Sequence, residues 1–342
     1  MKFFPYPRLS IIPVILVAIS ILLSIASLAQ AQSPWLNWQN SPPIEDSLVG
    51  RIWSVAKMRF ISPQQLASQL AHSRYVLIGE VHDNVDHHLL QAWLIEQIAA
   101  KATPAIVMEM IAADQSQLLD EYLSGLDAEP AGIGPALDWD KSGWPDWTYY
   151  QPIAEVAMRF GLRILPGNPD RKSVRKIARQ GINSIDKAEQ KRLSLDQTLS
   201  ASLNEELVQD IKDSHCNLLP QSMVGPMVDV QRFRDARLAR AVVDAGAQSK
   251  IGAEDSGTGR AILIAGNGHV RSDRGVPWYL IHQQPMATIS SVMLLETGGE
   301  LSKLEELIVT DALGKPAADY FWFTPQAKRE DQCEKLRQRF KK

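Results

Sequence analysis

Two apolar runs in this chain end in the same Gly-x-x-His pattern, and this repetition constrains the fold more than any other feature. Residues 75–79 are followed by Glu80 and His82, and residues 261–266 by His269. Short apolar runs of this kind are typical of buried parallel strands, whose carboxyl ends form the ligand-binding edge of α/β sheets. Residues two apart in an extended strand point to the same side. We therefore expect Glu80, His82 and His269 to line one pocket.

Strand and helix patterns alternate along the chain after the first run. Residues 85–99 repeat apolar side chains with helical spacing, and Asp83 and Asn84 can cap the start of that helix. Further helices are predicted over 62–72, 114–123 and 226–245, and further strands over 104–110, 162–168, 261–265, 288–295 and 320–323. This alternation predicts an α/β fold with a mostly parallel sheet flanked by helices. The charged segment 183–219 is expected to be a helical insertion.

The N-terminus has the features of a targeting segment. Lys2 and Arg8 precede an apolar run over 11–28, and residues 29–31 read Ala-Gln-Ala, a small-x-small cleavage site. We expect a signal peptide over 1–31; the alternative is an uncleaved membrane anchor. Export then directs the protein to the periplasm or the cell envelope.

The remaining boundaries follow from the same patterns. Residues 32–72 are expected to form a leader and a helix, 73–330 the α/β domain, and 331–342 a C-terminal tail. In an oxidising compartment Cys216 and Cys333 could pair, or remain two thiols. The net charge of -3 gives no support to nucleic-acid binding, which usually requires a basic face.

Two further charged residues fall on apolar patterns. Glu109 ends the predicted strand 104–110, and Arg234 lies on the apolar stripe of the helix 226–245. A buried arginine needs a carboxylate partner, so we expect Arg234 to pair with Glu80 or Glu109, unless it extends to the helix edge. The candidate catalytic set is Glu80, His82, Glu109, Arg234 and His269. The alternative is a buried ion network without chemistry.

Aromatic residues gather in the segment 139–150, which contains three Trp and two Tyr. This segment is expected either to be a loop held on the core by its aromatic side chains or to form a wall beside the pocket. His87 and His88, by contrast, are expected to lie on the exposed start of the helix 85–99.

Four ordered motifs resemble the ChaN-like family of bacterial haem-binding uptake proteins, within a superfamily that also contains the Tiki metalloproteases and the erythromycin esterases. They are Gly79-Glu80-Val81-His82-Asp83-Asn84 with His87-His88, Gln231-Arg232-Phe233-Arg234-Asp235, Gly266-Asn267-Gly268-His269-Val270-Arg271, and Asp319-Tyr320-Phe321-Trp322-Phe323-Thr324-Pro325. The resemblance implies an exported protein that binds haem for iron uptake, with an envelope haem receptor or transporter as partner and a homodimer as its assembly.

The resemblance also raises two questions about the site. Haem in the family is held through a tyrosine, and Tyr149 and Tyr150 are the candidates because they lie beside the Trp cluster. In the esterases a histidine acts as base on water, and His82, Glu109 and His269 match those positions. In the Tiki branch the motifs hold a divalent metal, for which Glu80, His82 and His269 are the candidates. The alternative function is thus a hydrolase of an ester or amide, metal-assisted or not.

Overall fold

The computed structural model describes residues 1, 33–41, 48–249, 259–298 and 303–340. The predicted signal peptide, apart from Met1, lies outside the described residues. Within the described ranges, no helix combines the length and the apolar character needed to cross a bilayer.

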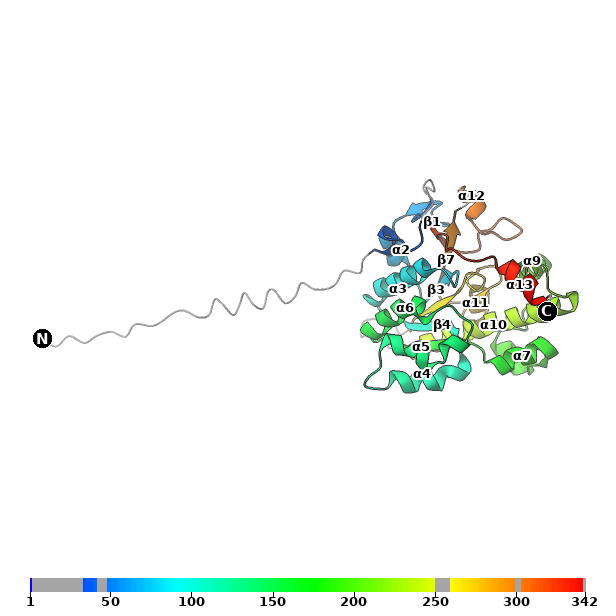
Figure 1. Ribbon diagram of the computed structural model, residues 1–342, viewed down its shortest axis with the longest axis horizontal. Coiled ribbons are helices and arrows are strands. Elements are labelled where there is room, and N and C mark those ends of the chain that lie inside the picture. Colours follow the sequence, from blue (N-terminus) through cyan, green and yellow to red (C-terminus); the bar gives the residue numbers. More distant parts are fainter. Residues whose placement is uncertain (2–32, 42–47, 250–258, 299–302, 341–342) are drawn as a thin grey trace.

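One eight-stranded sheet forms the centre of the molecule, with the strand order β2-β1-β8-β7-β3-β6-β4-β5 (Figure 1). Neighbouring strands are parallel from β8 through to β5, whereas β1 pairs antiparallel with β2 and β8. The strands are β1 (Ile52–Ser54), β2 (Arg59–Ile61), β3 (Tyr75–Glu80), β4 (Ala105–Ala112), β5 (Ile164–Asn168), β6 (Ala261–Gly266), β7 (Ile289–Thr297) and β8 (Tyr320–Pro325). The predicted α/β fold is confirmed. The β1–β2 pair was not predicted, because strands of three residues are too short to show alternation.

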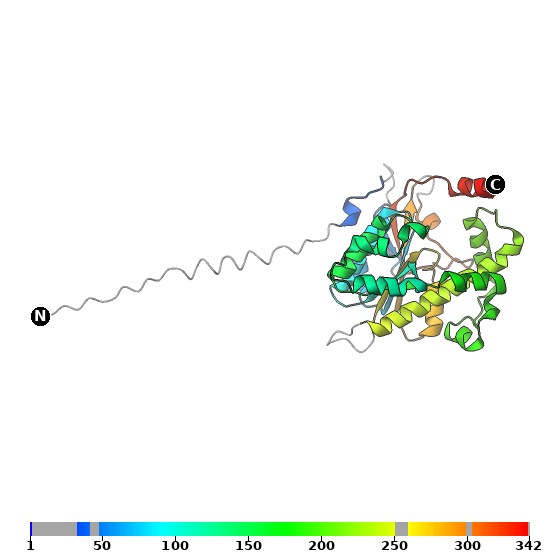
Figure 2. The ribbon, with the colours of Figure 1, turned by 60° about the horizontal axis from the view of Figure 1, so that its bottom comes forward.

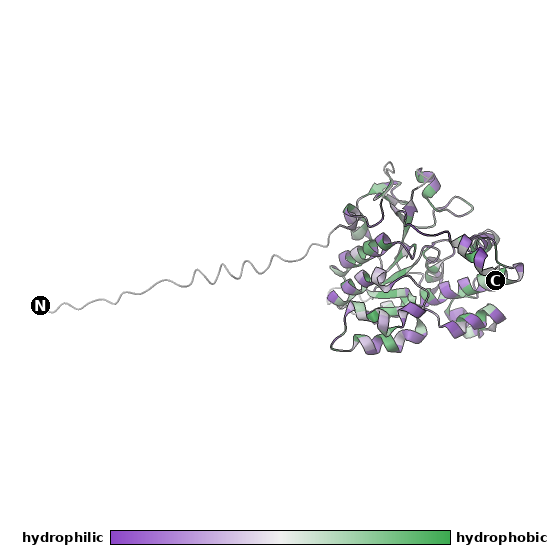
Figure 3. Ribbon diagram, in the orientation of Figure 1, coloured by the Kyte–Doolittle hydropathy of each residue, from purple (hydrophilic) through white to green (hydrophobic). Residues whose placement is uncertain are grey.

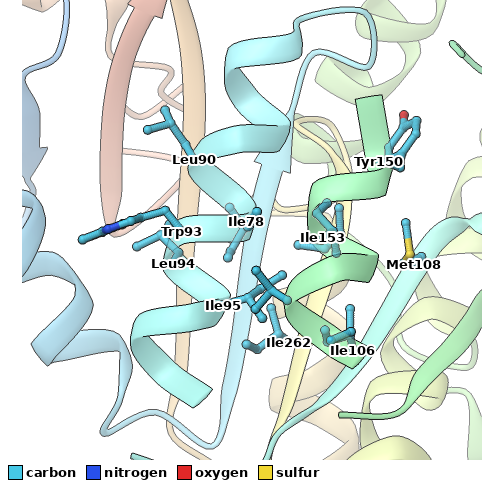
Figure 4. Packing of buried hydrophobic residues seen from close by; sticks show 14 of the residues in the cluster. Ile78, Leu90, Trp93, Leu94, Ile95, Ile106, Met108, Tyr150, Ile153 and Ile262 are labelled. Carbon is cyan, nitrogen blue, oxygen red and sulfur yellow. The ribbon is translucent and has the colours of Figure 1, made fainter. Parts of the chain in front are cut away.

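Helices cover both faces of the sheet because alternate residues of a buried strand point to opposite sides. On one face, Ile78, Ile106 and Ile262 pack against Leu94 of α3 and Ile153 of α6 (Figure 4). On the other face, residues such as Leu77, Val107 and Leu263 pack against α10. The helices of the first face are α2 (Pro63–Leu70), α3 (Val85–Ala99), α4 (Ser116–Leu123), α5 (Ile133–Ala136) and α6 (Trp147–Arg159). Those of the second are α7 (Arg171–Gln180), α10 (Gln221–Gln248), α11 (Val276–Gln283) and α12 (Leu304–Leu307).

Local capping explains why two of these helices start where they do. The Ser62 hydroxyl accepts a hydrogen bond from the backbone N–H of Gln65, and the side-chain Oε1 of Gln65 accepts one from the backbone N–H of Ser62. Helix α2 follows, with Pro63 in its first turn. The side chain of Asn84 caps α3 by accepting from the backbone of Asp86. Asn84 was one of the two predicted caps.

The segment 183–219 is helical, as predicted. Its residues are largely hydrophilic, whereas those of the central strands are apolar (Figure 3). It contains α8 (Lys187–Arg192) and α9 (Ala201–Ser214). The C-terminal helix α13 (Gln332–Phe340) lies next to the junction of α9 and α10 (Figure 2), and Cys216 forms a disulfide with Cys333 there. The 3-10 helices are η1 (Pro34–Leu36), η2 (Ala113–Gln115), η3 (Pro130–Gly132), η4 (Trp139–Lys141) and η5 (Ile182–Ser184).

Candidate functional site

The carboxyl ends of three neighbouring parallel strands bring four of the predicted polar side chains together. Glu80 ends β3 opposite Gly266, which ends β6, and Glu109 lies near the end of β4. His82 and His269 follow β3 and β6 by two and three residues. This is the edge at which open α/β sheets bind ligands. We call Glu80, His82, Glu109, Asp235 and His269 the cavity floor.

Glu80 is a buried carboxylate with several hydrogen-bond partners. Its Oε1 lies 2.7 Å from His82 Nδ1 and accepts from the hydroxyl of Tyr150 at 3.0 Å. Its Oε2 accepts from Gln91 Nε2 at 2.8 Å and lies 3.4 Å from His88 Nδ1. Burial raises the pKa of Glu80, but the neighbouring His88 and His82 outweigh it and hold this pKa well below its ordinary value.

His82 is the most accessible member of the floor, with 33% of its side chain exposed. Its ring packs 4.8 Å from that of Trp144, and a Cβ at Gly266 would lie 2.9 Å from its Nε2. A side chain at the end of β6 would therefore displace this imidazole from its position. Burial lowers the pKa of His82, but the hydrogen bond to Glu80 and the charge of that carboxylate raise it above its ordinary value.

His269 lies between two carboxylates. Its Nε2 is 3.1 Å from Glu109 Oε1, and its Nδ1 is 2.6 Å from Asp235 Oδ1. Glu109 also accepts from the backbone of Gly266 at 2.8 Å, and Gln231 donates to Asp235 at 3.2 Å. Both ring nitrogens of His269 are thus engaged inside the protein.

Burial and the neighbouring charges act against each other in this triad. Burial lowers the pKa of His269, yet Glu109 and Asp235 raise it to about 10. Burial raises the pKa of Glu109, yet His269 lowers it to about 2. Burial raises the pKa of Asp235 despite its contact with His269. At neutral pH the floor therefore holds an ionised Glu109 against a protonated His269.

A cavity of about 870 Å³ opens above the floor. Glu80, His82, Asp235 and His269 line it directly. Further lining comes from Trp144 and Tyr149, from Arg274, and from α9, whose lining residues are Leu207, Asp210, Ile211 and Ser214. We call these four residues of α9 the outer wall.

The aromatic segment confirms neither expectation alone, because it supplies both core and lining residues. Trp139, Trp147 and Tyr150 are buried in the core on one face of the sheet, whereas Trp144 and Tyr149 line the cavity. Tyr150 is fully buried; burial, with the nearby charge of Glu80, raises its pKa far above the ordinary value. Of the two tyrosines predicted as haem ligands, Tyr149 alone lines the cavity.

Two predictions from the sequence are wrong. Within the described ranges Arg234 makes no ion pair with Glu80 or Glu109, because histidines, Gln91, Tyr150 and the Gly266 backbone take up those carboxylates. Asp235, the next residue on α10, reaches the floor instead.

The second wrong prediction concerns His87 and His88, which are both completely buried. His87 accepts from the Val81 backbone and meets Thr324 at 2.8 Å, and His88 Nε2 lies 2.9 Å from the His82 carbonyl. Burial lowers the pKa of His87 to about 3. These two buried histidines therefore fix the position of the loop after β3 through its backbone.

No group of three or more His, Cys, Asp or Glu side chains in the described part of the chain is arranged to hold a metal ion. The predicted ligand set of Glu80, His82 and His269 fails for a visible reason: both nitrogens of His269 are bound to carboxylates. The geometry thus gives no support to a divalent metal.

Comparison with known proteins extends this picture. The family model described as haem-binding uptake, Tiki superfamily, ChaN matches residues 66–280. A solved structure described as cofacial heme binding to ChaN of Campylobacter jejuni is 21% identical, with a TM-score of 0.60, and the match covers 82% of this chain and 98% of that one. No curated protein matches the chain.

More distant solved structures share less of the fold. The type III effector HopBA1 is 13% identical, with a TM-score of 0.43 over 86% of this chain and 100% of that one. A mutant of the erythromycin esterase EreC in its open conformation is 11% identical, with a TM-score of 0.41 over 79% and 95%.

The family assignment rests on the sequence match rather than on these distant folds. The matched residues 66–280 extend from α2 to α11 and include every residue of the cavity floor. They make up well over half of the chain, and the ChaN structure from Campylobacter jejuni shares its fold. The chain therefore belongs to the ChaN family of haem-binding uptake proteins in the Tiki superfamily.

Proposed function

We propose that this protein binds ferric haem in the cavity at the carboxyl edge of its sheet. The observation that carries the proposal is the cavity itself, which is about 870 Å³ in volume and combines Trp144 and Tyr149 with Leu207 and Ile211 of the outer wall. Ligand and cofactor sites typically occupy ~300–1,000 Å³ and are mostly apolar with a few placed polar groups. Membership of the ChaN family supports the same ligand.

Two side chains in the cavity have the chemistry of an axial ligand. The iron of bound haem would accept a phenolate or an imidazole, and Tyr149 and His82 carry these groups. Tyr150 does not fit this role, because it is buried and donates its hydroxyl hydrogen bond to Glu80. We therefore assign the predicted tyrosine ligand to Tyr149.

A haemin titration of the mature protein tests this assignment, and the adjacent tyrosines form a matched pair. The wild type is expected to give a shifted, saturable Soret band. Tyr149→Phe should alter the charge-transfer band of the ferric complex, whereas Tyr150→Phe should leave it unchanged. Haem binding is the wrong function if no saturable Soret shift appears. If it appears and Tyr149→Phe keeps the wild-type spectrum, the ligand lies elsewhere.

The proposal extends to export and assembly. The Cys216–Cys333 disulfide supports an oxidising compartment, and we propose export by removal of residues 1–31, with a receptor or transporter of the envelope as partner. N-terminal sequencing should find Gln32 first; Met1 on the mature protein would indicate an uncleaved anchor.

The relative from Campylobacter jejuni binds heme cofacially. A cofacial pair here would join two copies, so native mass should double with haemin.

Hydrolysis is the second candidate function, and one observation favours it. The Nδ1 of His82 is held 2.7 Å from Glu80 while the ring borders the cavity, as a general acid or base would require. An assay with activated aryl esters and amides tests it, with His82→Ala as the inactivating variant. Equal rates for wild type and His82→Ala would remove this candidate.

A further inference from the structure

The outer wall of the cavity is attached to the molecule separately from its two main cores. Leu207 and Ile211 of α9 are buried in a small apolar cluster with Val228 of α10. The two large clusters that cover the faces of the sheet contain no residue of α9. Few buried apolar contacts make a segment open locally at low free energy. The position of the outer wall therefore depends on ion pairs and on a disulfide.

Polar contacts fasten the first half of α9. Glu206 accepts from Arg274 Nη1 at 2.6 Å, and Asp210 pairs with Nη2 of the same arginine. Arg274 is itself almost fully buried and also contacts Asp273 at 2.7 Å. Arg274 thus ties α9 to the loop after β6, and Glu206 also lies 3.8 Å from Arg271 and accepts from the backbone of Ala312. The last turn of α9 lies outside this network.

The disulfide fastens the other end of the wall. Ser214, the last residue of α9, lines the cavity, and Cys216 follows in a turn where it and Asn217 adopt positive φ values of 56° and 57°. Residues other than glycine rarely adopt this left-handed backbone conformation. Cys333 of α13 holds the turn from a distance of 117 residues in sequence.

The segment that carries Cys333 is anchored at its other end beside the cavity as well. After β8, the backbone of Ala327 donates to Glu296 at 3.0 Å, and Arg329 pairs with Glu296 and with Asp83 at 3.0 Å. Asp83 lines the cavity. Residues 326–333 therefore form a strap between two parts of the cavity lining, with an ion pair at one end and a disulfide at the other (Figure 2).

We propose that the Cys216–Cys333 disulfide is a redox-sensitive fastening of the outer wall, and that its reduction by a dithiol loosens α9 and speeds the exchange of bound haem. The step transfers two electrons and two protons from the dithiol, which becomes a disulfide, and leaves two protein thiols. Haem exchange rests on the proposed function, whereas the loosening of α9 does not. The cavity floor stays in place because its side chains are hydrogen-bonded to one another over the strands of the central sheet.

Hydrogen exchange followed by mass spectrometry tests the fastening without any ligand. The full mature chain is compared when oxidised, when treated with a dithiol, and as the Cys216→Ser, Cys333→Ser double variant. Amides of α9 should exchange ~10-fold faster after reduction and in the double variant, as expected for a lost local restraint. Amides of β3 and β6 should keep their rates, and the double variant should not respond to dithiol.

Haem exchange is measured as the transfer of haemin from this protein to apomyoglobin. The transfer rate should rise when the wild type is reduced, and addition of dithiol should not change it for the double variant. Unchanged exchange in α9 overturns the proposal, as does faster exchange throughout β3 and β6, which would make the disulfide a global restraint. Faster exchange in α9 with an unchanged haemin transfer rate overturns the regulatory role. If haemin does not bind, the proposed function fails, and the exchange data still decide whether the wall is fastened.

Discussion

The cavity floor and the outer wall border the same space but are held by different forces. The floor consists of polar side chains at or just after strand ends together with Asp235 of α10, and its carboxylates and imidazoles are hydrogen-bonded to one another. Directly beneath them lie the buried strands of the central sheet, from Ile78 and Met108 to Ile264. Satisfied polar groups over a packed core form a rigid site.

The outer wall has little of this support. Its apolar residues form a small separate cluster, the ion pairs of α9 are made with Arg274 and Arg271, and a disulfide follows its last residue. On the two proposals made above, the chemistry of this cavity and access to it are separable: the floor would determine what is bound, and the wall would determine how readily it enters and leaves.

The largest expected effect comes from removing one carboxylate in each region. Glu109→Gln leaves the protonated His269 with one buried partner fewer, at a cost of about 3–5 kcal/mol in the free energy of unfolding. Glu206→Gln leaves Arg274 with Asp273 and Asp210 and should cost about 1 kcal/mol or less. Urea unfolding measures both. The exposed Glu205→Gln is the control and should lie within about 0.5 kcal/mol of wild type.

Equal destabilisation of these two variants would contradict the difference between the cavity floor and the outer wall. A small cost for Glu109→Gln would mean that His269 simply loses its proton without further consequence. A large cost for Glu206→Gln would show that the wall folds as one unit with the sheet.

Much of the floor could be predicted from sequence because it follows strand ends. An apolar run that ends in Gly-x-x-His fixes which edge of the sheet its polar residues reach, and this located Glu80, His82 and His269. Asp235 was missed because the helix 226–245 was interpreted from its apolar stripe, on which Arg234 falls. Gln231 and Asp235, one turn apart, were the available sign of a second polar position facing the floor.

Helix orientation and tertiary cover account for what the sequence left open at the other positions. Tyr149 and Tyr150 are adjacent on α6, so their side chains point in different directions. Which of the two faces the cavity depends on where the helix begins, at Trp147. His87 and His88 are buried because β8 and the loop after β3 cover the first turn of α3. Pairing of Cys216 with Cys333 was one of the two outcomes expected from the sequence, but no local pattern shows that this disulfide, across 117 residues, lies beside the cavity.

The second prediction is that the pH dependence of stability comes from the floor and its support. The pKa of His269 is raised from 6.5 to about 10, so its contribution is complete below pH 6.5 and is lost as pH rises toward 10. The pKa of His87 is lowered from 6.5 to about 3, so its contribution is lost as pH falls below 6.5. Lowering of the Glu109 pKa from 4.5 to about 2 adds a loss below pH 4.5.

Stability should therefore be greatest near pH 6.5 and should fall on the alkaline side by roughly 1 kcal/mol per pH unit. Thermal and urea unfolding between pH 5 and pH 9 measure this profile. His269→Gln should flatten the alkaline side, whereas Glu206→Gln should leave the profile unchanged. An alkaline slope that persists in His269→Gln would assign the titration to another group.

The smallest effect is expected for Arg234→Met, although the sequence assigned this arginine to the floor. An ion pair with Glu80 or Glu109 would make its loss cost about 3–5 kcal/mol. Instead the Nε of Arg234 is buried without a hydrogen-bond partner among the described residues, and both carboxylates are taken up by other groups. Replacing an unsatisfied buried donor with an apolar chain of similar length removes a cost as well as packing, so the free energy of unfolding should change by less than about 1 kcal/mol. Urea unfolding of Arg234→Met beside the exposed Arg175→Met gives the comparison, and the two should agree closely. A loss of several kcal/mol for Arg234→Met alone would mean that the arginine does neutralise the carboxylates of the floor.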